Sequence, residues 1–153
     1  MLATSHALTA GVILKTFPDP RISLPLAFLS HFVLDLIPHW DFTTYRGNHG
    51  ALTLAGEKDR FKLAFLAGGD VLGGLGLTFW IFSDLSPTLL FATIIFAQLP
   101  DWLEMPYYFW GINFAPSRWV KKLQSKVHSR RRLPWGLLTQ LLVIIPLLWW
   151  SLH

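Results

Sequence analysis

Residues 61–82 read FKLAFLAGGDVLGGLGLTFWIF, and this stretch decides the class of the fold. Lys62 and Asp70 are its only charged residues, and its length suits a helix that crosses a bilayer. The composition agrees, since 52% of the 153 residues are hydrophobic and only 14% are charged. A soluble domain carries about 25% charged residues. We therefore expect an all-α integral membrane protein.

Prolines and polar turns divide the chain into a bundle of about five helices, which forms a single transmembrane domain over residues 1–153. Pro18 and Pro20 end the first helix, and Ser86 is a candidate N-cap with Pro87 at the first helical position. Residues 41–60 are polar and are predicted to form a loop. The helices are predicted at residues 2–15, 22–38, 61–82, 88–99 and 133–152; three of them (22–38, 61–82 and 133–152) are clear spans, and two are shorter and contain polar residues.

Seven of the 13 lysines and arginines lie between residues 118 and 132. Bases recur every four residues from Arg118, opposite an apolar line through Trp119 and Leu123, which predicts an amphipathic segment over residues 116–132 at the membrane interface. Its bases would meet anionic headgroups; a solvated charge run that only sets topology is the alternative. The predicted spans place this segment and the polar loop on one side, which the positive-inside rule makes cytoplasmic. Since the membrane accounts for these bases, nucleic-acid binding is not expected.

The second informative stretch reads HFVLDLIPHWD, residues 31–41, at the end of a predicted span. In a helix His31 and Asp35 lie one turn apart on one face, and His39 continues that line beyond Pro38. Ionisable groups at membrane depth are costly and usually face a partner, water or a metal. The chain has no cysteine, which leaves imidazole and carboxylate as metal ligands. The pattern predicts a divalent metal site; a hydrogen-bonded His–Asp pair at a capped helix end is the alternative.

The predicted topology brings further ionisable residues to the same side. Asp70 lies among glycines that would let another helix approach, bringing its carboxylate to the helix of Asp35; a polar packing role is the alternative. Asp101 and Glu104 share a helix face, and could bind a metal, divide acid and base catalysis or cap a helix start. The predicted metal ligands are His6, His31, Asp35, His39, Asp70 and Asp101, and the predicted proton carriers are Glu104 and His128.

Three short motifs resemble the YdjM-like membrane-bound metal-dependent hydrolases. They are Ser5-His6, Leu99-Pro100-Asp101 after an apolar helix, and the histidine-rich helix end at residues 31–41. Members of that family are small multispanning proteins with dispersed His and Asp motifs, so the resemblance implies hydrolase activity. The family's His-Arg-Gly-x-Thr-His-Ser element has its nearest match in YRGNHG, residues 45–50. There tyrosine replaces the first histidine, the spacing before His49 is one residue shorter, and the serine is absent.

The residues and the resemblance together predict a hydrolase embedded in a bacterial-type inner membrane, with a His/Asp centre facing the cytoplasmic leaflet. The metal would be Zn or Mn, with Mg as an alternative, and it would activate water toward a phosphate or ester bond of a lipid-like substrate. Membrane lipids are the expected partners, with an anionic headgroup held by the basic segment. A metal ion or proton transporter and a non-catalytic membrane scaffold are the alternatives.

Overall fold

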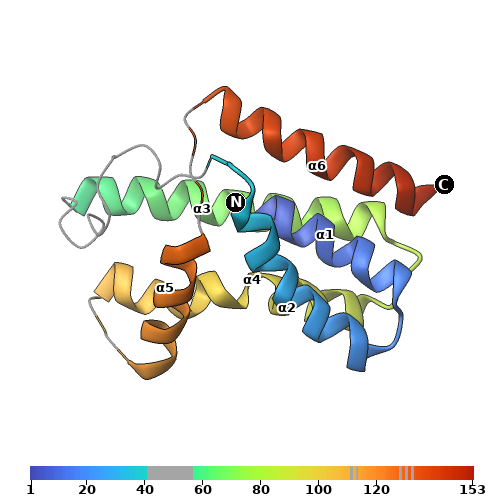
Figure 1. Cartoon of the computed structure of the whole chain (residues 1–153), viewed down its shortest axis with the longest axis horizontal. Coiled ribbons are helices and arrows are strands. Elements are labelled where there is room, and N and C mark those ends of the chain that lie inside the picture. Colours follow the sequence, from blue (N-terminus) through green and yellow to red (C-terminus); the bar gives the residue numbers. More distant parts are fainter. Residues whose placement is uncertain (41–56, 111, 113, 128, 130, 132) are drawn as a thin grey trace.

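The computed structural model describes residues 1–40, 57–110, 112, 114–127, 129, 131 and 133–153, and every regular element in these ranges is a helix (Figure 1). The predicted all-α class is therefore confirmed. The described part of the chain forms six helices, which are counterparts of the five predicted ones together with the basic segment, predicted to be amphipathic and also helical. They are α1 (Ala3–Thr16), α2 (Pro20–Leu36), α3 (Glu57–Ile81), α4 (Pro87–Trp110), α5 (Ala115–Val127) and α6 (Trp135–Leu152).

Capping residues and prolines set the starts of two helices. α2 begins earlier than expected because the Oδ1 of Asp19 accepts a hydrogen bond of 2.8 Å from the Arg21 amide, and Pro20 takes the first helical position. α4 begins at Pro87, as predicted. α3 begins at Glu57, so the end of the predicted loop is helical. The rest of that loop lies outside the described residues.

α4 continues beyond its predicted end at Leu99. It passes through Pro100 and Pro106 and ends only at Trp110. Each proline removes one hydrogen bond from the helix, and neighbouring helices in membrane proteins compensate for such a loss. Because of this continuation, the residues on both sides of Pro100 belong to one helix.

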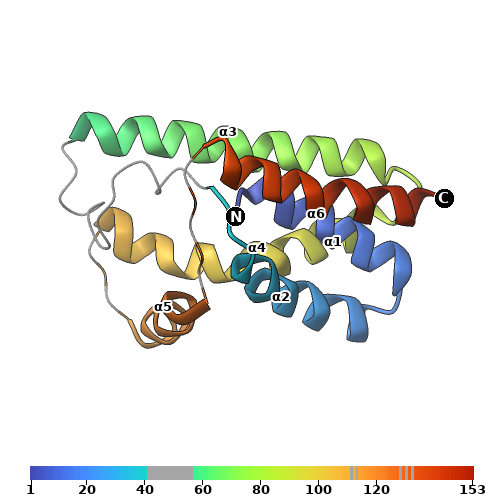
Figure 2. The same cartoon turned by 45° about the horizontal axis from the view of Figure 1, so that its top comes forward.

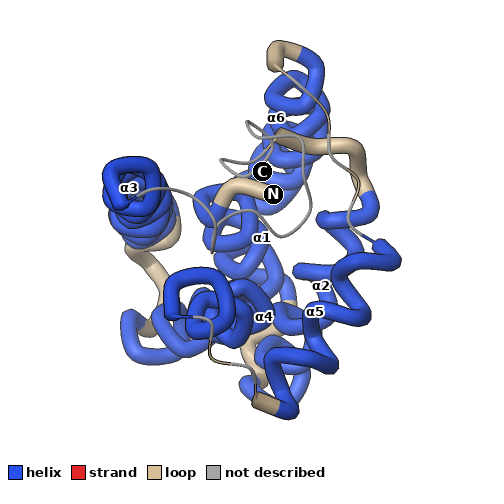
Figure 3. The backbone as a smooth tube through the Cα atoms, turned by 90° about the vertical axis from the view of Figure 1, so that its left-hand side faces the viewer, coloured by secondary structure: helices blue, strands red, loops and turns tan. Residues whose placement is uncertain are grey.

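α1 is the central helix of the bundle. It packs against α2, α3, α4 and α6, and the view along the bundle in Figure 3 shows these helices around it. The α1–α2 and α3–α4 connections lie at the same end of the molecule as the C-terminus, whereas α5 lies toward the other end (Figures 1 and 2). The start of α1 and the end of α2 meet beside the middle of α3 (Figures 1 and 2). Their polar residues are therefore enclosed by other helices.

Glycines allow the closest helix contacts in the bundle. A Cβ atom at Gly74 would lie 2.6 Å from the Cα of Thr4, and one at Gly11 would lie 2.4 Å from the ring of Phe82. Among the glycines of α3, Gly74 thus packs closely on α1, and not on the helix of Asp35 as the sequence predicts, whereas a Cβ at Gly68, Gly69, Gly73 or Gly76 would have no atom within 4 Å. Next to this contact lies an apolar core of Ala7, Ala10, Val12, Leu14, Ala27, Phe82, Leu90, Ile94 and Ala97.

Two helices in the described ranges are long and apolar enough to cross a membrane, namely α3 over Ala64–Ile81 and α6 over Trp135–Leu152. Only 11% of the first segment and 17% of the second is buried, whereas a core helix of a soluble protein is mostly buried. Large apolar side chains that are at least 70% exposed include Leu72, Trp80 and Leu142. The third predicted span, residues 22–38, is not confirmed, because α2 has only 17 residues.

Candidate metal centre

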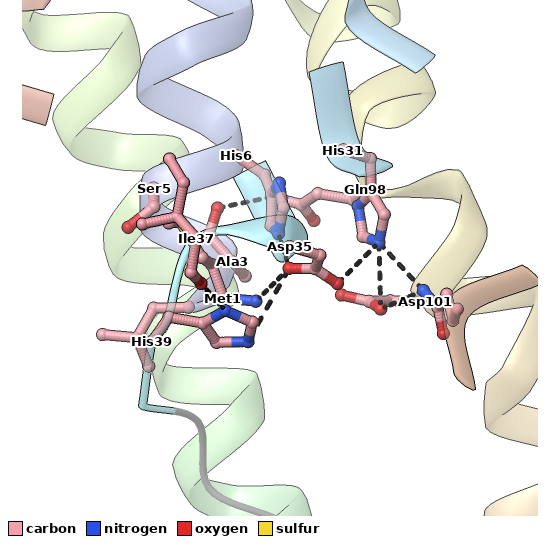
Figure 4. Close-up of polar contacts among 12 residues, drawn as sticks. Met1, Ala3, Ser5, His6, His31, Asp35, Ile37, His39, Gln98 and Asp101 are labelled. Atoms are coloured by element: carbon pink, nitrogen blue, oxygen red, sulfur yellow. Dashed lines mark hydrogen bonds and ion pairs between the residues drawn. The ribbon is translucent and has the colours of Figure 1, made fainter. Parts of the chain in front are cut away.

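Four fully buried side chains meet where α1 begins and α2 ends (Figure 4). His6 belongs to α1, His31 and Asp35 belong to α2, and His39 follows α2. Asp101 of α4 approaches from the side of His31, and its side chain is 43% exposed. The structure thus brings five of the six predicted metal ligands into one group, which we call the centre.

Asp35 lies in the middle of the centre. Its Oδ2 is 3.5 Å from the Nε2 of His31, and its Oδ1 is 3.6 Å from the Nε2 of His6 and 3.8 Å from the Nε2 of His39. The Nε2 of His31 also lies 3.4 Å from the Oδ1 of Asp101. The four-residue spacing along α2 is what aligns His31 with Asp35 on one helix face. One carboxylate therefore faces three imidazole rings.

Backbone carbonyl groups fix the tautomers of two histidines. The Nδ1 of His31 is 2.9 Å from the carbonyl oxygen of Ala97, and the Nδ1 of His39 is 2.8 Å from that of Ile37. A carbonyl oxygen only accepts hydrogen bonds, so in the neutral rings each Nδ1 carries the proton and each Nε2 presents a lone pair toward Asp35. Histidines that bind metals commonly donate their other ring N–H in this way.

The His6 ring is fully buried, and neither of its nitrogens makes a hydrogen bond. It stacks on the ring of His31, with the centroids 4.2 Å apart and an interplanar angle of 17°. A buried polar group without a hydrogen bond costs about 1–3 kcal/mol, a cost that a bound cation would remove. The candidate ligand atoms of His6, His31 and Asp101 all lie within 4.8 Å of one another, so this group can hold a metal ion.

Two hydrogen-bond donors reach the centre. The amino group of Met1 donates to the Oδ1 of Asp35 at 2.5 Å. The side-chain nitrogen of Gln124, on α5, lies 2.9 Å from the Nε2 of His31 and 3.1 Å from the Oδ1 of Asp101. Since an amide nitrogen donates, its contact with His31 agrees with a lone pair on that Nε2. The Met1 amino group thus places a positive charge on Asp35, and the Gln124 amide places an N–H group on the lone pair of His31.

The sequence prediction did not include Gln124. The predicted apolar line of α5 through Trp119 and Leu123 is exposed, by 79% and 47%, and the buried face of the helix carries Ser117 and Gln124. They lie seven residues apart and therefore share a helix face, so the available signal was a pair of uncharged polar residues on a strongly charged helix.

Asp70 lies outside the centre and caps the start of α1. Its Oδ2 accepts a hydrogen bond of 2.6 Å from the Ala3 amide, and its Oδ1 accepts one of 2.6 Å from the Thr4 hydroxyl. The free amides at a helix start attract a carboxylate, and the helix dipole adds to this attraction. This corrects the expectation that Asp70 reaches the helix of Asp35, because the contact at Gly74 joins α3 to α1.

Of the two predicted proton carriers, the described residues include Glu104 but not His128. Glu104 is buried on α4, one turn beyond Asp101. His128 lies outside the described residues, as do Asp41 and His49.

Backbone hydrogen bonds hold His39 against the segment between α5 and α6. The His39 amide donates to the carbonyl of Ser129 at 3.0 Å, and the His39 carbonyl accepts from the amide of Arg131 at 2.7 Å. The next amide, of Trp40, donates to the carbonyl of Gly136 at 3.1 Å. A Cβ at Gly136 would lie 2.5 Å from the nitrogen of Trp40, so only glycine fits this crossing. We call this set of contacts the clamp.

No protein family, curated protein or solved structure matches this chain. The resemblance to the YdjM-like hydrolases therefore stays a prediction from short motifs. The chemistry that the centre supports has to be inferred from its own geometry.

Proposed function

We propose that this protein is a membrane-embedded, metal-dependent hydrolase whose centre faces the cytoplasmic leaflet of a bacterial-type inner membrane. The observation that carries the proposal is the direction of the imidazole lone pairs. His31 and His39 aim Nε2 at Asp35, and the buried His6 ring has no hydrogen bond. The imidazole nitrogens and the Asp35 carboxylate lie 3.5–3.8 Å apart and together offer the lone pairs and the negative charge that a divalent metal binds. A metal bound there would replace the donors that now reach the centre, the Met1 amino group and the Gln124 amide.

The donor set favours Zn or Mn, with Mg as the alternative. Imidazole nitrogens suit Zn and Mn, whereas carboxylate oxygens extend the choice toward Mg. His6, His31, Asp35 and Asp101 would hold the metal, with His39 as a further ligand. The carbonyl partners of His31 and His39 would orient the rings before the metal binds.

The centre is accessible on the side of Asp101. The side chain of Asp101 is 43% exposed, whereas those of His31 and Asp35 have no exposed surface. A substrate would therefore arrive between α4 and α5. A bound metal would lower the pKa of a water molecule and polarise a phosphoryl or ester oxygen. Glu104 would take up the released proton, and His128 is the second proposed carrier.

The surroundings of the centre support a lipid-like substrate. α3 and α6 are apolar and mostly unburied, as helices in contact with lipid would be. α5 carries Gln124 to the accessible side of the centre, and the same helix exposes Arg118, Lys122 and Lys126. These bases would attract an anionic headgroup to the entrance. Their concentration in one segment also makes that side cytoplasmic by the positive-inside rule.

The buried core favours hydrolysis over transport. A metal or proton transporter needs polar groups along a path to both faces of the membrane. Beyond the centre, an apolar cluster in the described core includes Leu14, Leu90 and Ile94. The buried hydroxyl groups of Thr9, Thr78 and Thr93 donate to carbonyl groups of their own helix, whereas that of Ser23 has no hydrogen bond.

Metal analysis of the purified protein tests the proposal. After expression with added Zn and Mn, the wild type in mild detergent should retain stoichiometric metal, and a His31→Ala/Asp35→Ala variant should lose it. His153→Ala, which changes an exposed histidine at the chain end, is the control and should match the wild type. Metal-free wild-type protein would refute the proposal.

Activity assays then separate the alternatives. A hydrolase should release product from phosphate esters or phospholipids in mixed micelles, and the double variant should not. A transporter should instead move metal into proteoliposomes without releasing product. A scaffold predicts that the metal content is the same in the wild type and the double variant.

A further inference from the structure

We infer that the centre binds two metal ions, bridged by the Asp35 carboxylate, and that its substrate is a phosphate ester. This inference rests on the proposed function and specifies its metal site. It starts from the fact that the imidazoles do not all face the same oxygen of Asp35. His31 faces Oδ2, whereas His6 and His39 face Oδ1.

The first metal position lies among His31, Asp101 and Asp35. The Nε2 of His31 is 3.4 Å from the Oδ1 of Asp101 and 3.5 Å from the Oδ2 of Asp35. Metal bonds of about 2.0–2.2 Å at tetrahedral angles place two ligand atoms of one ion about 3.3–3.6 Å apart. Both distances agree with a shared ion. Gln124, which now donates to His31 and Asp101, occupies the side that a water molecule or substrate would take.

The second metal position lies among His6, His39 and Asp35. The Oδ1 of Asp35 is 3.6 Å from the Nε2 of His6 and 3.8 Å from the Nε2 of His39, so an ion bound to this oxygen could take either imidazole as a ligand. His6 has no hydrogen bond that an ion would have to break. The amino group of Met1 lies on this same Oδ1 at 2.5 Å. This side of the carboxylate therefore already accommodates a positive charge, which an ion would replace.

A single ion would use the residues differently. The group of His6, His31 and Asp101, within 4.8 Å of one another, could hold one ion without His39. That arrangement leaves unexplained why the Ile37 carbonyl and the clamp orient the His39 ring toward Asp35. A carboxylate that bridges two ions offers one oxygen to each, with the ions about 3.5–4 Å apart. His39 is thus the residue that distinguishes the two arrangements.

Two ions would also narrow the substrate class. Paired metal ions stabilise both the attacking and the leaving oxygen of an in-line displacement at phosphorus. Two divalent ions exceed the charge of the two carboxylates, Asp35 and Asp101, so the centre would carry excess positive charge. An anionic phosphate group would be attracted to this charge and to the bases of α5, whereas an uncharged carboxylic ester would not.

Loading with Mn²⁺ tests the inference. The protein is tagged at the C-terminus so that the Met1 amino group is retained, and unbound Mn²⁺ is removed. The wild type and the His153→Ala control should contain two Mn²⁺ per chain and give an exchange-coupled electron paramagnetic resonance spectrum. His39→Ala should contain one Mn²⁺ and give the six-line spectrum of an isolated ion. His39→Gln, which keeps more of the side-chain volume, should do the same, and far-UV circular dichroism verifies the helix content of both variants.

The outcomes separate the second ion from the proposed function. One uncoupled Mn²⁺ in the wild type, with phosphate-ester hydrolysis retained, would refute the second ion and leave the hydrolase intact. Neither metal nor hydrolysis in the wild type would refute both. Two coupled ions with hydrolysis of carboxylic esters but not of phosphate esters would overturn the substrate assignment. If the His39 variants do not fold, the wild-type spectrum alone decides between one ion and two.

Discussion

Replacing Gly74 by alanine should force α1 away from α3 and disturb the centre. The new Cβ would lie 2.6 Å from the Cα of Thr4, about 0.8 Å short of the 3.4 Å at which ordinary contact begins. It would also lie 3.1 Å from the Thr4 amide nitrogen, so the obstacle is backbone and cannot rotate away. α1 has to move as a unit, and it carries His6 two residues beyond the contact.

The loss of stability in Gly74→Ala is best measured relative to Gly73→Ala, a matched control on the same helix. Overpacking of this kind costs about 1–3 kcal/mol. Alanine has a higher helix propensity than glycine, which should stabilise the folded state by up to about 1 kcal/mol. Gly73→Ala receives the same helix benefit, but nothing lies within 4 Å of its Cβ. The difference between the two variants should therefore be about 1–3 kcal/mol, with Gly74→Ala the less stable.

Both variants are to be unfolded in mixed micelles by added denaturing detergent, with helix content followed by circular dichroism. Metal affinity is measured on the same samples, because metal ligands tolerate displacements of only about 0.2 Å. Gly74→Ala should bind Zn²⁺ more weakly, and Gly73→Ala should match the wild type. Equal stability and equal affinity for the two variants would show that α1 and α3 are not in contact at Gly74.

Three further predictions concern residues around the centre. Asp70→Asn should lower the free energy of unfolding by about 0.5–2 kcal/mol through the weakened helix cap, with the metal content unchanged; a loss of metal would make Asp70 a ligand after all. Gln140→Leu should lower the melting temperature, because its Oε1 accepts from the Leu2 amide and the Ser5 hydroxyl, and each buried group left unsatisfied costs about 1–3 kcal/mol. Arg118→Gln/Lys126→Gln should raise the KM for an anionic substrate at low salt without changing kcat. High salt should remove that effect, and an unchanged KM at low salt would contradict the role of these bases.

Local spacing made the core of the centre predictable. The four-residue interval from His31 to Asp35 determines neighbouring positions on α2 without reference to other helices. His39 lies beyond the end of α2 at Leu36, so its place beside Asp35 does not follow from helical spacing. The absence of cysteine likewise restricted the possible metal ligands to imidazole and carboxylate groups. The apolar run of α3 likewise indicated a span from composition alone.

The partners of single residues were not predictable, because they depend on which helices touch. Asp70 and its glycines indicated a close contact, but the contact is with α1, and this turned an expected ligand into a helix cap. The sequence signal for Gln124 was only that it shares an uncharged polar face with Ser117 on a strongly charged helix. It reaches the centre only because α5 buries its uncharged polar face.

The clamp has a consequence for the order of events during synthesis. Trp40, next to His39, is held by a hydrogen bond of 2.8 Å from the side chain of Gln140, 100 residues later in the chain. A ribosome that adds about 5–20 residues per second needs about 5–20 s to cover this distance. During that interval His6, His31 and His39 have been synthesised, but the segment between α5 and α6 that binds the His39 backbone has not. A metal bound at the centre should therefore enter as one of the final steps of maturation, after α6 has packed against α1.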